Sequence, residues 1–244
     1  MLVNRVIFFL LTLMIMAVLL AIGSHPFLAA AITILLIVII YITAGMVRNK
    51  YRMGLLDDRC DPEAFLERTD KQINITGRNP ALKNILLINR STGLIELGRF
   101  EEAKEILLSI DKSRLSVRNG SLFAYTANLI SCYFGSGEID RAEELFETEM
   151  AVLPPIGKKA EFAAKMLVAK RLFHLKRYCE SREQFNKLLA QKISKRARMS
   201  ILYYLARMDE IEGNRESAML KYSEVAKEGN KLWIARQSGA GHDA

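Results

Sequence analysis

Two long apolar runs near the N-terminus constrain this chain more than any other feature of its sequence. The first covers residues 6–22 and is interrupted only by Thr12, and the second covers residues 27–47. A helix rises about 1.5 Å per residue, so it needs roughly 20 apolar residues to cross the hydrocarbon layer of a membrane, although about 17 suffice. Each run therefore predicts a membrane-spanning helix.

Charged residues are almost confined to the rest of the sequence. Before Arg48 the only Lys, Arg, Asp or Glu is Arg5, and 34 basic and 27 acidic residues follow. The 197 residues from Arg48 onward are enough to bury a hydrophobic core of their own. We therefore expect a membrane anchor at residues 1–47 and a water-soluble region after it.

The segment between the two runs is Gly23-Ser24-His25-Pro26. Glycine and proline interrupt a helix, and four residues leave room only for a tight reversal, so the two spans are expected to form a hairpin. The alternative is a cleaved signal peptide followed by one span. It is disfavoured because no Ala-x-Ala-like cleavage site follows the first run and Arg5 is the only charge before it.

The orientation of the hairpin follows from the basic residues beside the second run. Arg48, Lys50, Arg52 and Arg59 lie just after it, while the turn between the spans carries no fixed charge. Positively charged flanks stay on the cytoplasmic side of a membrane. We expect a two-span protein of the cell membrane with both termini in the cytoplasm.

Two capping sequences mark the first helices of the soluble region. Asp61 and Asn79 each precede a proline, and this order places a capping side chain directly before a proline at the first helical position. The first helix is expected to be short, ending near Thr69. The second opens a long helical region.

A turn sequence recurs four times in that region. It occupies Leu97–Ala103, Gly137–Ala142, Lys176–Ser181 and Gly213–Ala218. The small residues that end these segments are separated by 39, 39 and 37 residues. A fixed period of this size predicts stacked two-helix units.

Each turn is followed by an amphipathic helix. Four residues beyond each small residue stands a bulky one, and these are Leu107, Phe146, Phe185 and Tyr222. With further apolar residues one turn later they form a stripe that the next helix pair must cover.

This pattern resembles the tetratricopeptide-repeat (TPR) family, whose helix-turn-helix units carry a Gly-x-Tyr-x-x-Ala turn followed by an aromatic residue. The best matches are the first unit, with Gly98, Phe100 and Ala103, and the third, with Tyr178, Ser181 and Phe185. The chain departs from the family in its longer period, in lacking the terminal proline, and at the small position of the first helix, which aligns with Ser91, Ile130, Ala169 and Ala206. The resemblance implies an α-solenoid of about four repeats, and a helical bundle is the alternative.

The expected fold is therefore all-α. Its parts are a transmembrane hairpin at residues 1–47, a basic connector with a short helix at 48–78, TPR-like repeats at 79–237, and a disordered tail at 238–244.

Charge is uneven along the repeats. Residues 96–149 carry a net charge of −5, while residues 158–207 carry +11. Such a basic region could attract an acidic peptide, the anionic inner leaflet or nucleic acid, whereas the simplest alternative is a solvated helix surface. Nucleic acid is disfavoured because no recognised binding motif is present and few aromatic residues are placed for base stacking.

The resemblance also implies that the first helix of each unit lines a partner-binding groove. The residues brought there are Asn89, Asn128, Ser131, Lys170, Arg171, Tyr203 and Arg207. Asn128 coincides with an asparagine of the family's carboxylate clamp, but the other clamp residues do not match. Lys170 and Arg207 occupy corresponding positions in adjacent units, so we expect them to hold an acidic segment.

No catalytic function is expected. The sequence has no phosphate-binding glycine loop, metal-ligand motif or nucleophile elbow, so neither a cofactor nor a metal is predicted. The predicted function is that of a membrane-anchored adaptor or scaffold that binds a protein or peptide partner. The alternatives are a structural subunit assembled through the hairpin and, less favoured, an unrecognised enzyme.

Overall fold

The computed structural model describes the backbone of residues 2–76 and 79–240, and the side chains of residues 9–76 and 79–240. Within these ranges the secondary structure is helical throughout, with no strand, which confirms the all-α class. The longer helices are α1 (Leu2–Ala21), α2 (Pro26–Asp57), α3 (Pro62–Thr76), α4 (Pro80–Glu96), α5 (Phe100–Leu108), α6 (Ser121–Gly135), α7 (Ile139–Thr148), α8 (Lys158–His174), α9 (Tyr178–Leu189), α10 (Lys195–Ile211), α11 (Arg215–Glu228) and α12 (Trp233–Ala240). Short 3-10 helices, η1 (Lys112–Arg114) and η2 (Met150–Val152), follow α5 and α7. The chain divides into two compact units, Met1–Tyr51 and Arg52–Ala244.

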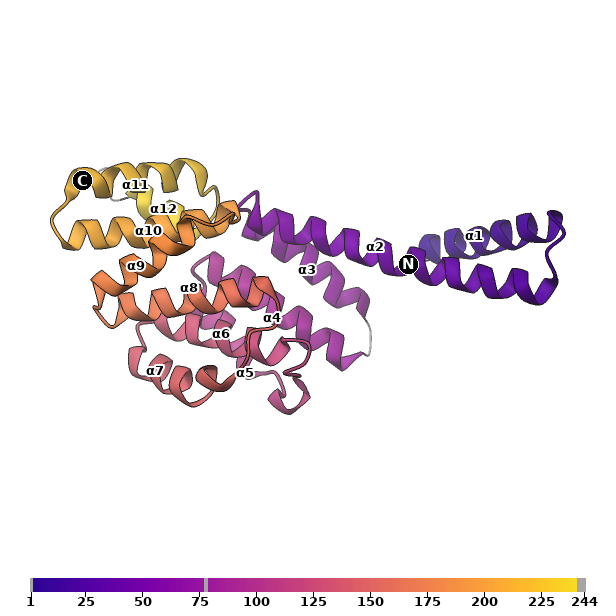
Figure 1. The fold of residues 1–244 in the computed structure, drawn as a ribbon, viewed down its shortest axis with the longest axis horizontal. Coiled ribbons are helices and arrows are strands. Elements are labelled where there is room, and N and C mark those ends of the chain that lie inside the picture. The colour runs from indigo at the N-terminus through magenta and orange to yellow at the C-terminus, as the bar shows by residue number, and fades with distance from the viewer. Residues whose placement is uncertain (1, 77–78, 241–244) are drawn as a thin grey trace. The chain divides into compact units, whose positions relative to one another are not determined.

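The first unit contains α1, a tight turn and most of α2. Gly23 has a φ of 83°, a left-handed conformation that suits glycine, and its N–H donates to the carbonyl of Leu20 at 3.0 Å. Pro26 then begins α2, and the two helices run in opposite directions from the turn (Figure 1).

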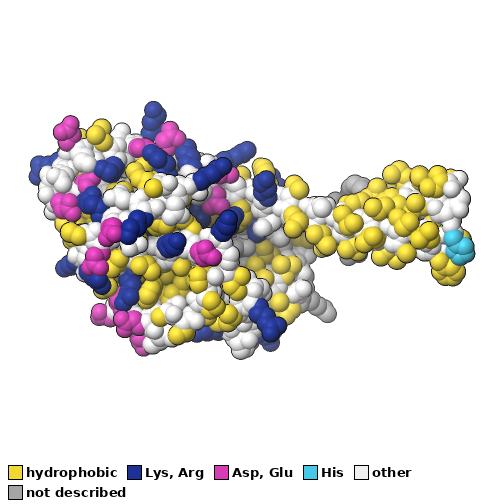
Figure 2. Space-filling view, in the orientation of Figure 1, with side chains coloured by type: hydrophobic (Ala, Val, Ile, Leu, Met, Phe, Trp, Pro, Cys, Tyr) yellow, Lys and Arg dark blue, Asp and Glu magenta, His cyan; other side chains and the backbone are white. Residues whose placement is uncertain are grey.

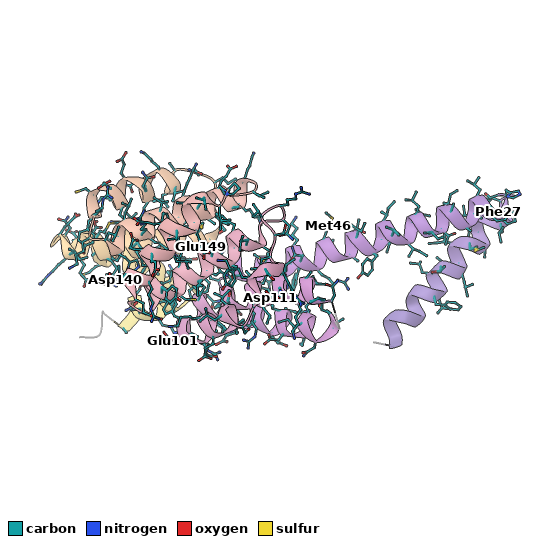
Figure 3. All side chains as sticks on the ribbon, turned by 90° about the horizontal axis from the view of Figure 1, so that it is seen from below. Phe27, Met46, Glu101, Asp111, Asp140 and Glu149 are labelled. Atoms are coloured by element: carbon teal, nitrogen blue, oxygen red, sulfur yellow. The ribbon has the colours of Figure 1, made fainter. Side chains whose placement is uncertain are left out.

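The surface of the first unit is strongly apolar (Figure 2). Phe27 and Met46 point outward from α2 with 83% and 67% of their surface exposed (Figure 3). In the described part of the chain, α2 is the one helix long and apolar enough to cross a membrane. The part of α1 whose side chains are described, Phe9–Ala21, is a shorter apolar helix.

The second unit begins inside α2, which continues ten residues beyond the expected end of the span. Leu55 and Leu56 of its last turns pack with Phe65 of α3 in a small core. The Arg52 guanidinium donates to the Gln72 side chain at 2.7 Å. Because α2 and α3 stabilise each other in this way, residues 48–57 are helical, and α3 extends past Thr69 to Thr76.

Four helix pairs follow, one for each repeat of the sequence. They are α4/α5, α6/α7, α8/α9 and α10/α11. The residues that end their turns are left-handed, with φ values of 77° at Gly98, 78° at Gly137, 60° at Lys176 and 82° at Gly213. The small residues after the turns, Ala103, Ala142, Ser181 and Ala218, are all buried. The small side chains therefore let the paired helices approach closely, as the repeat pattern predicts.

Neighbouring pairs also pack on one another (Figure 1). The residues at the small position of the first helices, Ser91, Ile130, Ala169 and Ala206, are completely buried, although one of them is the large Ile130. Helix α6 packs on both α4 and α8, and α10 packs on α9. The unit is thus a chain of pairs in which each first helix lies among its neighbours.

The last helix touches the first pair, a contact that the sequence did not predict. Trp233 of α12 packs edge-on against Phe100 of α5 with the ring centroids 5.6 Å apart. Arg236 donates to the carbonyl of Leu97 at 2.7 Å, and Lys231 donates its backbone N–H to Cys60 at 3.2 Å. We call this set, Arg59–Glu63 and Leu97–Phe100 against Asn230–Gln237, the closing contact.

The C-terminal end of the chain differs from the expected disordered tail. Ser238 is buried, and α12 continues through Ala240, so residues 238–240 are helical where disorder was expected. Packing of α12 on α10 and α11 explains this order. Residues 241–244 lie outside the described part of the chain.

Candidate partner-binding site

The seven predicted groove residues lie on the first helices of the four pairs. Asn89 is on α4, Asn128 and Ser131 on α6, Lys170 and Arg171 on α8, and Tyr203 and Arg207 on α10. Tyr203 is buried and the others are half-buried. Their hydrogen bonds and ion pairs separate those that already have partners from those that could accept a ligand.

Asn128 and Ser131 have partners inside the fold. The Asn128 amide donates to the Ile88 carbonyl at 3.1 Å and to the hydroxyls of Ser91 at 3.1 Å and Thr92 at 2.9 Å. The Ser131 hydroxyl donates to the carbonyl of Ala127 at 2.8 Å. Asn128 therefore joins α6 to α4, and this use of its amide differs from that of a peptide clamp.

Arg171 is also committed within the fold. Its guanidinium contacts Glu143 at 2.6 Å and Glu147 at 3.0 Å, both on α7, and lies 4.4 Å from the centre of the Phe146 ring. The side chain thus faces α7 and not α10. Two carboxylates already neutralise its charge, so it is a poor candidate for an acidic ligand.

Lys170 precedes Arg171 but points toward α10. Its ammonium lies 5.5 Å from the centre of the Tyr204 ring. It forms no ion pair with an acidic side chain among the described residues. Burial lowers the pKa of Lys170, the charge of Glu96 opposes that change, and Arg196 adds to it. Lys170 is therefore a half-buried cation without a close carboxylate.

Arg207 lies on the adjacent helix in a similar environment. Its guanidinium carbon is 5.9 Å from the centre of the Phe173 ring and 6.0 Å from that of Tyr203. One nitrogen donates to the Tyr203 hydroxyl at 3.2 Å, and Glu210 is 4.0 Å away, at the limit of an ion pair. Arg207 thus retains most of its hydrogen-bonding capacity.

The two cations share one aromatic cluster. The Phe173 and Tyr204 rings meet edge to face with centroids 5.0 Å apart, so the rings beneath the two cations touch. Cations over ring faces gain a modest attraction, which holds their heads in place without neutralising them. We define the aromatic–basic cluster as Lys170, Phe173, His174, Tyr203, Tyr204 and Arg207.

His174 reports the positive field of this cluster. Its ring stacks on Phe134 of α6 with centroids 4.5 Å apart. Burial, followed by the charges of Lys170 and Arg207, lowers the pKa of His174 to about 4. The imidazole is therefore neutral near pH 7.

The structure brings together three of the seven predicted residues, namely Lys170, Tyr203 and Arg207. Asn89 stays on α4, half-buried and with no side-chain hydrogen bond to the described residues. Sequence reasoning missed His174 as a member of the site. The signal was its position four residues after Lys170, since residues four apart share one face of a helix.

A half-buried ion network near the cluster was also missed. Arg196 of α10 contacts Asp57 of α2 at 2.9 Å and Glu96 of α4 at 2.7 Å. These partners are 139 and 100 residues away in the sequence, so no local pattern could reveal them. The network holds the start of α10 to the first helices of the second unit.

A groove of about 630 Å³ lies between α10 and α11, away from the cluster. Four of its five charged lining residues already pair, Lys195 with Glu228 at 2.6 Å and Arg198 with Glu224 at 2.9 Å, and Lys227 is the fifth. The groove therefore has little attraction for a charged ligand. Within the described residues, no three His, Cys, Asp or Glu side chains gather to hold a metal ion.

Comparison with known proteins adds no further assignment. No protein-family model, curated protein or solved structure matches this chain.

Proposed function

We propose that this protein is a membrane-anchored cytoplasmic adaptor that binds an acidic segment of a partner protein through its TPR-like repeats. The observation that carries the proposal is the pair Lys170 and Arg207, two half-buried cations on touching rings with no closely bound carboxylate. A buried charge without a partner lowers stability, so its presence favours an anionic ligand. Other basic residues of the last two pairs, such as Arg171 and Arg196, have acidic partners.

The anchor in this proposal is a two-span hairpin of residues 6–22 and 27–47 in the cell membrane. The apolar length of both runs and the basic residues from Arg48 to Arg59 support this topology, with both termini in the cytoplasm. A protease added outside intact cells should leave the second unit whole, and the same protease should digest it in inside-out vesicles. Digestion in intact cells would contradict the orientation. A mature chain that lacks residues 6–22 would instead identify that run as a signal peptide.

The binding part is a solenoid-like array of four TPR-like pairs. Its left-handed turns and buried small residues support this description, because both recur at the period of the sequence. An adaptor needs only a surface that holds its partner, and it requires no catalytic residue, cofactor or metal.

Affinity capture from detergent-solubilised membranes tests the binding role. The variant K170E/R207E replaces the two cations by acids, and K159E/K192E makes the same net charge change at exposed lysines of α8 and the loop after α9. We expect the first variant to lose the partner and the second to retain it. Equal retention by both would overturn the proposal.

The alternative role, a structural subunit assembled through the hairpin, makes a different prediction. Replacing residues 6–22 and 27–47 by polyleucine spans of the same length keeps the anchor and removes its specific side chains. An adaptor should still capture its partner from the membrane. Loss of the partner would favour assembly through the hairpin.

A further inference from the structure

The aromatic–basic cluster has the chemistry of a small anion site. Its two cations come from different helices and lie over rings that touch each other, which fixes both charges on one platform. Phe173 and Tyr204 are each only 9% exposed, so other parts of the protein cover most of this platform. Both cationic residues are half-buried, and the Arg207 side chain is 40% exposed.

We propose that this cluster binds one carboxylate side chain of an acidic peptide, held between the Lys170 ammonium and the Arg207 guanidinium. This inference rests on the proposed adaptor function and names the group that its site recognises. Lys170 offers a compact ammonium, and Arg207 offers a planar guanidinium whose hydrogen bonds suit a carboxylate.

The charge around the site favours a carboxylate over a phosphate. Neither cation has a close carboxylate, but the charge of Glu96 acts on Lys170 and Glu210 lies 4.0 Å from Arg207, so some negative charge already surrounds the site. Lys170 and Arg207 also lie in the C-terminal parts of α8 and α10, where the helix dipole adds negative potential. The remaining positive charge therefore matches one negative charge better than two.

A peptide side chain suits the shape of the site better than a membrane surface. The cations sit among the helices α8 and α10, on rings that are nearly covered. A carboxylate on a short side chain can enter such a place, whereas binding to a bilayer is favoured by exposed basic residues on an open face. An anionic lipid is therefore the competing ligand that the experiment must exclude.

The pKa of His174 reports directly whether a carboxylate occupies the site between Lys170 and Arg207. The charges of Lys170 and Arg207 help to hold its pKa at about 4, and the other titratable side chain beside its ring is Tyr204, at a ring separation of 6.3 Å. A carboxylate bound between the two cations offsets their field, so the pKa of His174 must rise. A charge at roughly 12 Å with an effective dielectric constant of about 20 changes a pKa by about one.

The experiment is nuclear magnetic resonance of the full chain in nanodiscs of neutral lipid, with histidine rings labelled. The chain has three histidines, so the H174Q variant assigns the signal. At pH 5 a group with a pKa of about 4 is roughly one-tenth protonated, and a rise of one in the pKa makes it roughly half protonated. Hexa-aspartate peptide should therefore increase the protonated fraction of His174 about five-fold, while hexa-asparagine should leave it unchanged.

Three comparisons make this result specific. K170M and R207M should each abolish the response to hexa-aspartate, while K159M/K192M should keep it, and circular dichroism should show the same helix content in all. Inorganic phosphate and nanodiscs containing phosphatidylserine should give much smaller responses. No response to hexa-aspartate, or an equal one to phosphate or to phosphatidylserine, would overturn the carboxylate site.

The two proposals can fail separately. If hexa-aspartate moves the His174 signal but K170E/R207E still captures the partner, the carboxylate site stands and the adaptor role of this site fails. If partner capture is lost but hexa-aspartate leaves His174 unchanged, the adaptor role stands and the carboxylate site fails.

Discussion

The closing contact and the aromatic–basic cluster both use aromatic and basic residues, but their polar groups are satisfied to different degrees. In the closing contact, Arg236 has the carbonyl of Leu97, and Lys231 has Glu63 at 2.9 Å. In the cluster, Lys170 has no acidic partner among the described residues. The difference favours a stabilising role for the first region and is consistent with the binding role that we propose for the second. Substitutions should therefore separate the two regions.

The largest expected effect is at the closing contact. Trp233 is half-buried and packs on Phe100, against the backbone at Gly98 and on Tyr203 of the cluster, so W233A removes a large ring from these contacts. We expect a loss of about 4 kcal/mol in the free energy of unfolding. Urea unfolding of the full chain in detergent, followed by circular dichroism, measures it. The control W233F keeps a ring and should lose much less, and a loss below about 1 kcal/mol for W233A would show that the closing contact is not stabilising.

The next effect comes from His174, at the edge of the cluster. An unfolded histidine binds a proton below about pH 6.5, whereas the folded one stays neutral until about pH 4. Acidification through this window therefore favours the unfolded state, and stability should fall by about 3 kcal/mol between pH 6.5 and pH 4 because of this residue. Below that window the contribution stays constant. Urea midpoints across this pH range should vary less for H174F, which keeps the ring stacked on Phe134, and an identical pH profile would contradict the shifted pKa.

A smaller loss is expected at the ion network between the two regions. R196M leaves the carboxylates of Asp57 and Glu96 without their shared cation. We expect a loss of about 2 kcal/mol, less than for a fully buried pair because the Arg196 side chain is 24% exposed. The exposed Arg177–Glu180 pair is the matched control, and R177M should cause no measurable change. Restoration of stability in R196M/D57N/E96Q would assign the loss to the unpaired acids.

The smallest effect tests a turn outside both regions. Lys176 has a φ of 60° at the position that glycine occupies in the other three turns. K176G should raise stability by roughly 0.5 kcal/mol, because the relief of left-handed strain exceeds the cost of glycine's extra freedom when unfolded. Thermal unfolding compares it with K176A, which should gain nothing. A lower melting temperature for K176G would show that the lysine side chain stabilises this turn.

Local chemistry predicted much of the fold. The cap at Asn79, which accepts from the Leu82 N–H at 3.1 Å, and the left-handed turns each depend on a few adjacent residues. The continuation of α2 to Asp57 depends on its packing against α3, and the docking of α12 depends on contacts with segments more than 100 residues away, so no periodicity reveals them. The hydrophobic pattern identifies helices, but it does not say which helices meet.

The candidate site shows the same limit of sequence-based prediction within a single helix. Lys170 and Arg171 are adjacent basic residues, and both were predicted to line the groove. Successive residues of a helix point about 100° apart, so Arg171 reaches the acids of α7 while Lys170 reaches the ring of Tyr204. Which cation lacks a carboxylate depends on what the neighbouring helix presents, and the sequence of α8 alone does not contain that information.

The most direct test of the central claim is photo-crosslinking in native membranes. A photoreactive residue at position 163 lies on α8 two turns before Lys170 on the same face, and one at exposed position 219 on α11 serves as the control. We predict that position 163 captures an acidic segment of one partner protein, that position 219 does not, and that K170E/R207E abolishes the crosslink. Capture of the same segment from both positions, or capture unaffected by K170E/R207E, would contradict binding at the aromatic–basic cluster.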